Sequence, residues 1–324
     1  MMRTAFPCLR ARFLRANHRR VLGVAGVFTN RRFCATMASA GSQESQTGAD
    51  AGAARKRQAA AAKPAKKEIK ILMLHGFTQS GALFHAKTRA LEKLLVKTLA
   101  PWNLLPTLHY PTGPNRLLAS DMPGFSGDGA DDDPRAQDSW AWFRRDDASG
   151  SYRLLPEGMR AVAAAVRAAG GGVDGVLGFS QGGVVAAMVA GALEPDRAVP
   201  DTDDDKNDWG WVRELREANA GRPLRFAVVY SGFLATPPEL AWLTEPPLAT
   251  PTLHFIGSLD TVVDESRSRA LVARCRDPVV VEHPGAHYVP ISKEWAMPLL
   301  GFVKKRCVDD EQPAAAVAAA EANL

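Results

Sequence analysis

The chain has 324 residues and a formal net charge of +5, which would suit an anionic partner if the charge were evenly spread. Residues 1–67 carry 14 Lys and Arg against 2 Asp and Glu, whereas residues 68–324 carry 26 against 33. The body of the chain is therefore mildly acidic, and its composition argues against a nucleic-acid partner. The length suits one large α/β domain or two ordinary ones.

Residues 1–37 have the composition of a targeting leader. Eight arginines, interleaved with apolar residues, precede the first acidic residue, Glu44. This pattern is typical of a mitochondrial presequence. The apolar run at 21–28 is too short to cross a bilayer, so we expect no membrane span. A start at Met37 is the alternative, and it would give a cytoplasmic protein.

Residues 68–308 alternate between strand-like and helix-like segments. Strands are predicted at 68–74, 104–110, 173–179, 224–230, 252–256 and 279–282, and helices at 84–99, 156–169, 182–193, 264–275 and 292–305. This alternation predicts one α/β domain, with a mostly parallel sheet and helices on both faces. The Ala/Gly/Ser- and Lys-rich residues 38–67 predict a disordered linker, and the Ala-rich residues 309–324 predict a disordered tail.

Two stretches within the domain lack clear periodicity. Residues 120–150 are rich in Gly, Asp and Pro and include the sequence SWAWF, so we predict a loop or partial lid there rather than core. Residues 198–211 are predicted to form an acidic insertion at the surface. The aromatic residues that could line a pocket or fill the core are Trp140, Trp142, Phe143, Phe233 and Tyr288.

The pentapeptide Gly178-Phe179-Ser180-Gln181-Gly182 lies between a predicted strand and a predicted helix. A serine on such a tight turn is exposed as a nucleophile, and the flanking glycines avoid Cβ collisions. The helix N-terminus after it offers free N–H groups to a developing oxyanion. The alternative is an ordinary glycine-rich turn with a capping serine.

Acid and base partners follow the serine in the chain order that this motif requires. Asp260 comes after the strand at 252–256, and His287 comes after the strand at 279–282. His287 would accept the proton of Ser180, while Asp260 would hold the imidazole in the correct tautomer.

Each partner has a rival. Asp264 stands just before a helix and is better suited to capping it. His283 ends a strand directly, and the turn after it gives His287 the longer reach.

The second oxyanion donor is expected in the loop after the first strand. In His75-Gly76-Phe77 the backbone N–H of Phe77 would act together with that of Gln181. The His75 side chain is expected to brace this loop, although a plain strand-end histidine is the alternative. The body has two cysteines and no metal-binding spacing, so we expect no metal and no cofactor.

Several stretches together resemble the FSH-type family of serine hydrolases, an α/β-hydrolase group that includes the yeast family serine hydrolases and an ovarian-cancer-associated human relative. They are ILMLHGFTQSG, SWAWF, GVLGFSQGGVVAAM, VVYSGF, GSLDTVV and VEHPGAHYVP. The resemblance implies a Ser180–Asp260–His287 triad that hydrolyses carboxylic esters or thioesters through an acyl-enzyme.

The expected substrate is a small-molecule or acyl-carrier ester or thioester, because fungal relatives release acyl chains from carrier proteins. An idle ligand-binding protein and an acyltransferase with the same triad remain alternatives. The sequence leaves the oligomeric state, acyl chain length and leaving group open.

Overall fold

The computed structural model describes residues 66–121, 138–201 and 208–309. The predicted leader, and almost all of the predicted linker and tail, lie outside these residues. Within them, no helix is both long and apolar enough to cross a membrane.

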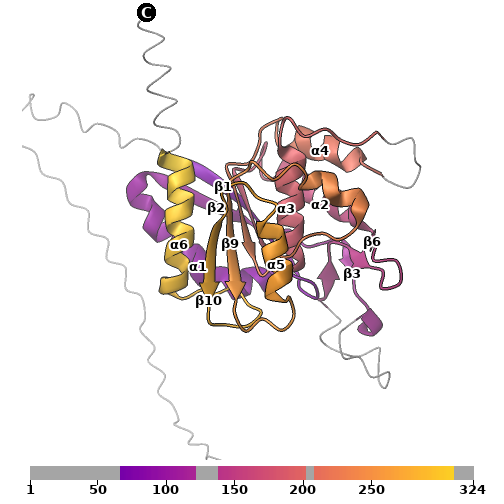
Figure 1. Cartoon of the computed structure of the whole chain (residues 1–324). Coiled ribbons are helices and arrows are strands. Elements are labelled where there is room, and N and C mark those ends of the chain that lie inside the picture. Colours follow the sequence, from indigo (N-terminus) through magenta and orange to yellow (C-terminus); the bar gives the residue numbers. More distant parts are fainter. Residues whose placement is uncertain (1–65, 122–137, 202–207, 310–324) are drawn as a thin grey trace, which may run out of the picture. The chain divides into compact units, whose positions relative to one another are not determined.

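Six strands form one central sheet, in the order β10-β9-β8-β7-β1-β2 (Figure 1). Every neighbouring pair in this sheet runs parallel. The strands are β1 (Lys67–Leu74), β2 (Leu104–His109), β7 (Gly175–Phe179), β8 (Phe226–Tyr230), β9 (Thr252–Gly257) and β10 (Val279–His283). The central strands β7 and β8 are buried at all five positions, as continuous apolar runs in a covered parallel sheet should be.

Helices cover both faces of the sheet (Figure 1), which confirms the predicted α/β fold. Helices α1 (Gly81–Leu99) and α6 (Lys293–Lys304) lie on one face. The other face carries α2 (Leu155–Ala168), α3 (Gln181–Leu193), α4 (Gly210–Ala218) and α5 (Glu265–Val272). Short helical turns are η2 (Ala100–Trp102), η3 (Ala119–Asp121), η5 (Pro238–Leu243) and η6 (Lys305–Asp309).

Helix α1 shows why these segments fold as predicted. Ser80 caps its N-terminus by accepting a hydrogen bond from the Leu83 N–H at 3.1 Å. The face expected to be apolar is buried against the sheet, namely Phe84, Thr88, Leu91, Leu95 and Leu99. The 3.6-residue spacing was therefore sufficient to identify the buried face.

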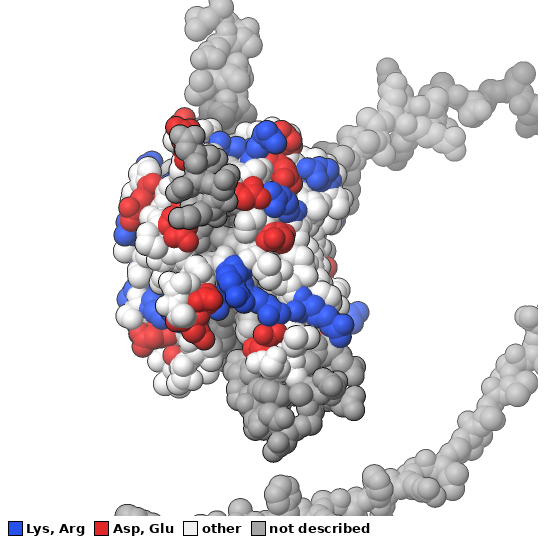
Figure 2. Space-filling view, turned by 90° about the vertical axis from the view of Figure 1, so that its right-hand side faces the viewer, with Lys and Arg blue, Asp and Glu red and all other residues white. Residues whose placement is uncertain are grey.

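Four two-residue strands form two small antiparallel ladders beside the sheet. β3 (Asn115–Arg116) pairs with β4 (Trp140–Ala141), and β5 (Arg144–Arg145) pairs with β6 (Tyr152–Arg153). The strands β3 and β6 lie on the right of Figure 1, and basic side chains run across that face of the molecule (Figure 2).

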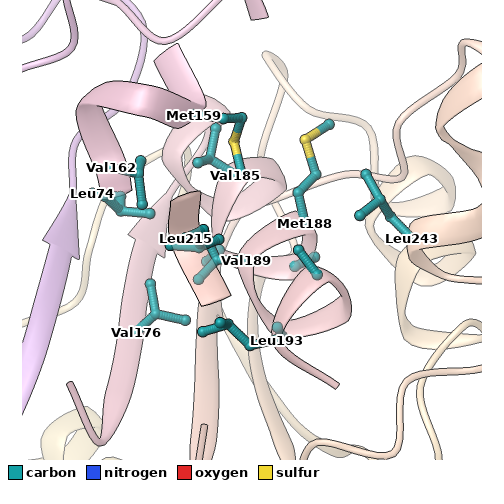
Figure 3. Packing of buried hydrophobic residues seen from close by; sticks show 14 of the residues in the cluster. Leu74, Met159, Val162, Val176, Val185, Met188, Val189, Leu193, Leu215 and Leu243 are labelled. Carbon is teal, nitrogen blue, oxygen red and sulfur yellow. The ribbon is translucent and has the colours of Figure 1, made fainter. Parts of the chain in front are cut away.

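The hydrophobic core has two parts, one on each face of the sheet. Alternate residues of β1 enter different parts, with Leu72 and Leu74 facing α3 and Met73 facing α1 and α6. Helix α3 is buried along its whole length. In Figure 3, Leu193 turns toward Val176 of β7. Each such buried aliphatic side chain stabilises the fold by about 1.5–3 kcal/mol, so this helix is firmly held.

Two predictions about irregular stretches were wrong. Trp142 and Phe143, expected in a loop or lid, are 0% and 2% exposed and belong to the core around α3. Residues 198–211 were expected at the surface, but Trp211 is fully buried at the start of α4. That helix was not predicted. It has only nine residues, and the acidic segment before it gives no sign of its buried face.

Candidate active site

The order of the strands directs attention to one edge of the sheet. The chain passes from β1 to β2 on one side and then returns to β7 on the other side of β1. In open parallel sheets, ligands bind outside the carboxyl ends of the strands at such a reversal. Two segments begin at the carboxyl ends of the strands here. They are the loop after β1, which starts at His75, and the turn after β7, which contains Ser180.

Ser180 sits on a strained turn between β7 and α3. Its φ is +55° and its ψ is −117°, a conformation that L-residues rarely adopt. A Cβ atom on Gly178 would lie 2.0 Å from the carbonyl oxygen of Gly182, and one on Gly182 would lie 2.2 Å from that of Leu74. Only glycine fits at either position, as the pentapeptide predicted. The Ser180 N–H donates to the Tyr230 carbonyl at 2.8 Å, which ties the turn to β8.

The structure brings Asp260 and His287 together. His287 Nδ1 lies 2.7 Å from Asp260 Oδ2, and the other carboxylate oxygen accepts the N–H groups of Val262 and Val263 at 2.9 Å each. Burial would raise the pKa of the Asp260 carboxyl. The hydrogen bonds from Val263 and His287 outweigh burial and hold that pKa below its usual value. A charged carboxylate therefore orients the imidazole.

His287 also lies beside the serine turn. Its ring centroid is 4.8 Å from that of Phe179, the residue before Ser180. The loops after β9 and β10 meet closely, since a Cβ on Gly257 would lie 2.6 Å from the Gly285 carbonyl oxygen. The three residues of the predicted triad thus come from turns at the carboxyl ends of three strands in one sheet.

The rival residues occupy other places. Asp264 caps α5 by accepting the Ser266 N–H at 2.9 Å, as its position before a helix predicted. His283 is 2% exposed at the end of β10, with its ring against those of Tyr288 and Trp295. Asp264 is therefore accounted for by capping, whereas His283 packs against aromatic rings and neither of its ring nitrogens has a hydrogen-bond partner among the described residues.

His75 braces the loop after β1, as expected. Its Nδ1 donates to the Gly76 carbonyl at 2.8 Å, and its Nε2 accepts the Gly113 N–H at 2.9 Å. Its own carbonyl oxygen accepts the indole N–H of Trp142 at 2.9 Å. Burial lowers the pKa of His75 to about 4, so the ring is neutral near pH 7 and keeps this pattern.

The Gln181 side chain has a role that the sequence did not predict. Its Oε1 accepts the Trp142 N–H at 2.8 Å, and its Nε2 donates to the Phe143 carbonyl at 2.8 Å. The residue after Ser180 is thereby locked to the SWAWF segment. Only the presence of a glutamine beside the serine hinted at this bond, because the spacing of about 40 residues carries no local signal.

Two backbone N–H groups remain available beside Ser180. Within residues 66–121, 138–201 and 208–309, no acceptor lies on the N–H of Phe77 or on that of Gln181. Phe77, Ser180 and Gln181 line one cavity of about 580 Å³. A buried helix N-terminus with such a free donor is well suited to an anionic oxygen.

His287 lines a second, smaller pocket of about 270 Å³, together with Phe179 and Tyr288. Of the aromatic residues whose role was open, Phe143 and Phe233 line the larger cavity, and Tyr288 lines the smaller. In the described part of the chain, no cluster of three or more His, Cys, Asp or Glu side chains could hold a metal ion.

Comparison with known proteins identifies the relatives of this chain. A family model described as "Serine hydrolase (FSH1)" matches residues 65–299. The chain is 32% identical to a dihydrofolate reductase of Schizosaccharomyces pombe, over 69% of this chain but only 44% of that protein, so it spans less than half of that relative.

Other relatives are matched over nearly their full length. Identity is 30% to Family of serine hydrolases 2 of Saccharomyces cerevisiae, over 72% of this chain and 94% of that protein. It is 28% to Esterase OVCA2 of Danio rerio, over 73% and 97%. Among solved structures, acyl-protein thioesterase 2 of Zea mays aligns with a TM-score of 0.45 at 22% identity, covering 74% of this chain and 94% of that one.

Proposed function

Because the chain belongs to the serine hydrolase (FSH1) family, we propose that it hydrolyses carboxylic esters or thioesters through an acyl-enzyme on Ser180. His287 accepts the proton of the Ser180 hydroxyl as its oxygen attacks the acyl carbon. The imidazolium then protonates the leaving alcohol or thiol. Water, deprotonated by His287, releases the acid and restores the serine. Asp260 keeps the Nδ1 proton of His287 directed away from Ser180.

The tetrahedral intermediate needs donors that are already in position. The N–H groups of Phe77 and Gln181 are unpaired in the described residues and border the cavity that Ser180 lines. Removing one such donor typically costs an enzyme about 100- to 1,000-fold in kcat. The His75 carbonyl oxygen and the Gln181 side chain both accept hydrogen bonds from Trp142, which holds the two donor-bearing segments in place, so the donors need no rearrangement during the reaction.

The observation that carries the proposal is the 2.7 Å contact between His287 Nδ1 and Asp260 Oδ2 beside a serine held at a φ of +55°. A strained non-glycine residue costs of order 1–3 kcal/mol, which the surrounding structure must offset. The relative named Esterase OVCA2 supports ester hydrolysis as the reaction. A ligand-binding protein would need neither the strain nor the oriented imidazole.

An activated serine can be tested directly. The full chain would be treated with a fluorophosphonate probe, and the modified residue would be mapped by mass spectrometry. We expect stoichiometric labelling of Ser180, which is lost in His287→Ala. The matched control is His85→Ala, which removes a partly exposed histidine on α1 and should still label. A folded protein that does not label would contradict the proposal and favour the ligand-binding alternative.

Hydrolysis and acyl transfer can be separated with the same protein. Turnover of an acyl ester would be followed in water and in the presence of added alcohols or thiols. We expect the free acid as the main product at every acceptor concentration. A new ester or thioester that replaces the acid at low acceptor concentration would make the protein an acyltransferase.

We also propose a mitochondrial address, supported by the arginine-rich composition of residues 1–37. A fusion of residues 1–45 to a fluorescent reporter should enter mitochondria. Diffuse cytosolic fluorescence from this fusion would contradict the proposal and support translation from Met37.

A further inference from the structure

The cavity beside Ser180 is lined by charged as well as apolar side chains. Four arginines contribute to its wall, against two aspartates, Asp121 and Asp147. The arginines are Arg144, Arg145, Arg153 and Arg267. Residues 68–324 as a whole are acidic, although basic side chains also gather on the face shown in Figure 2. The positive charge is thus local to the cavity.

Two of the four arginines already have carboxylate partners. Arg144 Nη2 lies 2.9 Å from Asp121 Oδ2, and Arg153 Nη1 lies 3.8 Å from an oxygen of Asp146. Within the described residues, no carboxylate lies within 4.0 Å of the guanidinium group of Arg145 or Arg267. These two arginines can therefore pair with an anion that arrives with the substrate.

Arg267 lies over an aromatic ring at the cavity wall. Its guanidinium carbon is 4.2 Å from the ring centroid of Phe233, within the range of a cation–π contact. A guanidinium group in such a contact can still donate two hydrogen bonds to a carboxylate. Arg145 comes from β5, while Arg267 comes from α5, so the two approach the cavity from different elements.

The arginines lie on the acyl side of the reaction. The larger cavity contains Ser180 and both proposed oxyanion donors, whereas His287 lines the other pocket. The leaving group takes its proton from the imidazole and therefore departs on the His287 side. The acyl group stays with the oxyanion donors, in the cavity that contains the arginines.

Building on the proposed function, we propose that the acyl group carries a carboxylate at its far end. The substrate is then a half-ester or half-thioester of a dicarboxylic acid. Its carboxylate binds Arg145 and Arg267, and its apolar spacer lies against Phe143, Phe233 and Val263. Ser180 forms a bond to the acyl carbon as the bond to the leaving oxygen or sulfur breaks. Water then releases the free dicarboxylate, and the alcohol or thiol leaves protonated.

The first test compares acyl groups that differ only in this carboxylate. Glutaryl and pentanoyl, and adipoyl and hexanoyl, N-acetylcysteamine thioesters would be assayed with the full chain. Hydrogen bonds from Arg145 and Arg267 to the substrate carboxylate would involve charged groups, which makes them stronger than neutral ones. We therefore expect kcat/KM to be roughly tenfold higher for the carboxylated member of each pair, mainly because KM is lower. The ratio should shrink toward one in 0.5 M salt because the arginines are exposed.

The second test removes the arginines one at a time. Arg145→Gln and Arg267→Gln should each lower the ratio of carboxylated to neutral substrate several-fold, and Arg267→Lys should restore part of it. The control is Arg213→Gln, since this side chain on α4 is 80% exposed and outside the cavity. That variant should keep the ratio. Fluorophosphonate labelling of Ser180 checks that every variant is folded.

The outcomes separate this inference from the proposed function. Equal turnover of both members of a pair, with Ser180 labelled normally, would overturn the carboxylate inference and leave the hydrolase proposal intact. A failure of all the thioesters and of labelling would overturn both. A preference for coenzyme A over N-acetylcysteamine with neutral acyl groups, and none for carboxylated ones, would assign the anion to the leaving group and also overturn the inference.

Discussion

Two adjacent strands of the sheet end in the same way, with a serine at positive φ. Ser180 follows β7 at a φ of +55°, and Ser231 follows β8 at +46°. Each N–H donates to a carbonyl of the next strand, Ser180 to Tyr230 at 2.8 Å and Ser231 to Phe255 at 2.9 Å. A glycine follows within two residues of each serine. By local geometry, the two turns are close equivalents.

They differ in what comes next. Helix α3 begins directly after Ser180, so a free N–H and the positive end of a helix lie beside it. After Ser231 the chain stays irregular until η5, and this serine is 1% exposed and outside the cavity. Backbone strain alone therefore does not mark a nucleophile. The helix N-terminus, the cavity and the histidine are what distinguish Ser180.

The largest expected effect is on catalysis, when the hydroxyl groups of Ser180 and Ser231 are removed in turn. Ser180→Ala should lower kcat/KM for an acyl ester by about 10³-fold or more, because triad knockouts retain only what binding and the oxyanion donors provide. Ser231→Ala should lower it by less than about tenfold, since that hydroxyl does not react and acts only on Asp260, whose pKa it helps to lower. Steady-state kinetics on both variants measures the contrast. Comparable losses would mean that the two turns are not functionally different.

The two carboxylates near the end of β9 allow a second comparison. Asp260→Asn should reduce kcat by about 10³- to 10⁴-fold, because an amide favours the wrong imidazole tautomer. Asp264→Ala should leave kcat nearly unchanged and slightly reduce stability through the lost cap of α5. Kinetics and thermal melting of both variants would distinguish the two roles. A large kinetic loss in Asp264→Ala would reverse the assignment.

The glycine that shapes the Ser180 turn should be essential for folding. In Gly182→Ala the new methyl group would lie 2.2 Å from the Leu74 carbonyl oxygen, a backbone atom that cannot move away cheaply. We expect the free energy of unfolding to fall by about 3 kcal/mol or more.

Gly301→Ala is the matched control, since its added Cβ atom would have no neighbour within 4 Å in helix α6. That change should raise the free energy of unfolding by about 1 kcal/mol, the difference in helix propensity. Urea denaturation measures both values. A Gly182→Ala protein as stable as the parent would show that the turn tolerates a side chain.

The last prediction concerns pH, through the two buried histidines His75 and His254. Burial lowers the pKa values of His75 and His254 to about 4 each, below the ordinary 6.5 that applies in the unfolded chain. Between pH 6.5 and 4 the unfolded state therefore binds more protons, and stability must fall as the pH falls. Each histidine contributes at most about 1.4 kcal/mol per pH unit in this window.

Denaturation curves at pH 7, 6 and 5 measure this slope, and NMR titration of the ring carbons identifies the residues. Both imidazoles should remain neutral at pH 5.5. Titration of His75 near pH 6.5 would show that its bonds to Gly76 and Gly113 do not hold it in the neutral form.

Much of the fold could be predicted from local patterns. The six strands were predicted to within a few residues, and so were α1, α2, α3, α5 and α6. Their periodicities reflect burial of one face or one run, which is a property of neighbouring residues. The proposed acid and base, Asp260 and His287, were chosen from the chain order of strands and loops, and the structure places their side chains 2.7 Å apart.

Other features depend on contacts between distant segments. Trp142 is buried in the core, with its N–H groups bonded to His75 and Gln181. These partners lie far from it in the chain, so the composition of residues 120–150 does not reveal them. Helix α4 was missed for a related reason, since its buried face becomes apparent only where it packs against α2 and α3.

The sequence by itself determined that a serine stands between glycines at a strand-to-helix turn, with an acid and a histidine after later strands. It could do so because a tight turn excludes every side chain larger than hydrogen at two fixed positions. Only the tertiary structure decided that Asp260 meets His287, that Arg145 and Arg267 lie with Ser180 on one cavity, and that Ser231 lies outside it. Those outcomes depend on how separate strands and helices pack in space, which local sequence spacing does not encode.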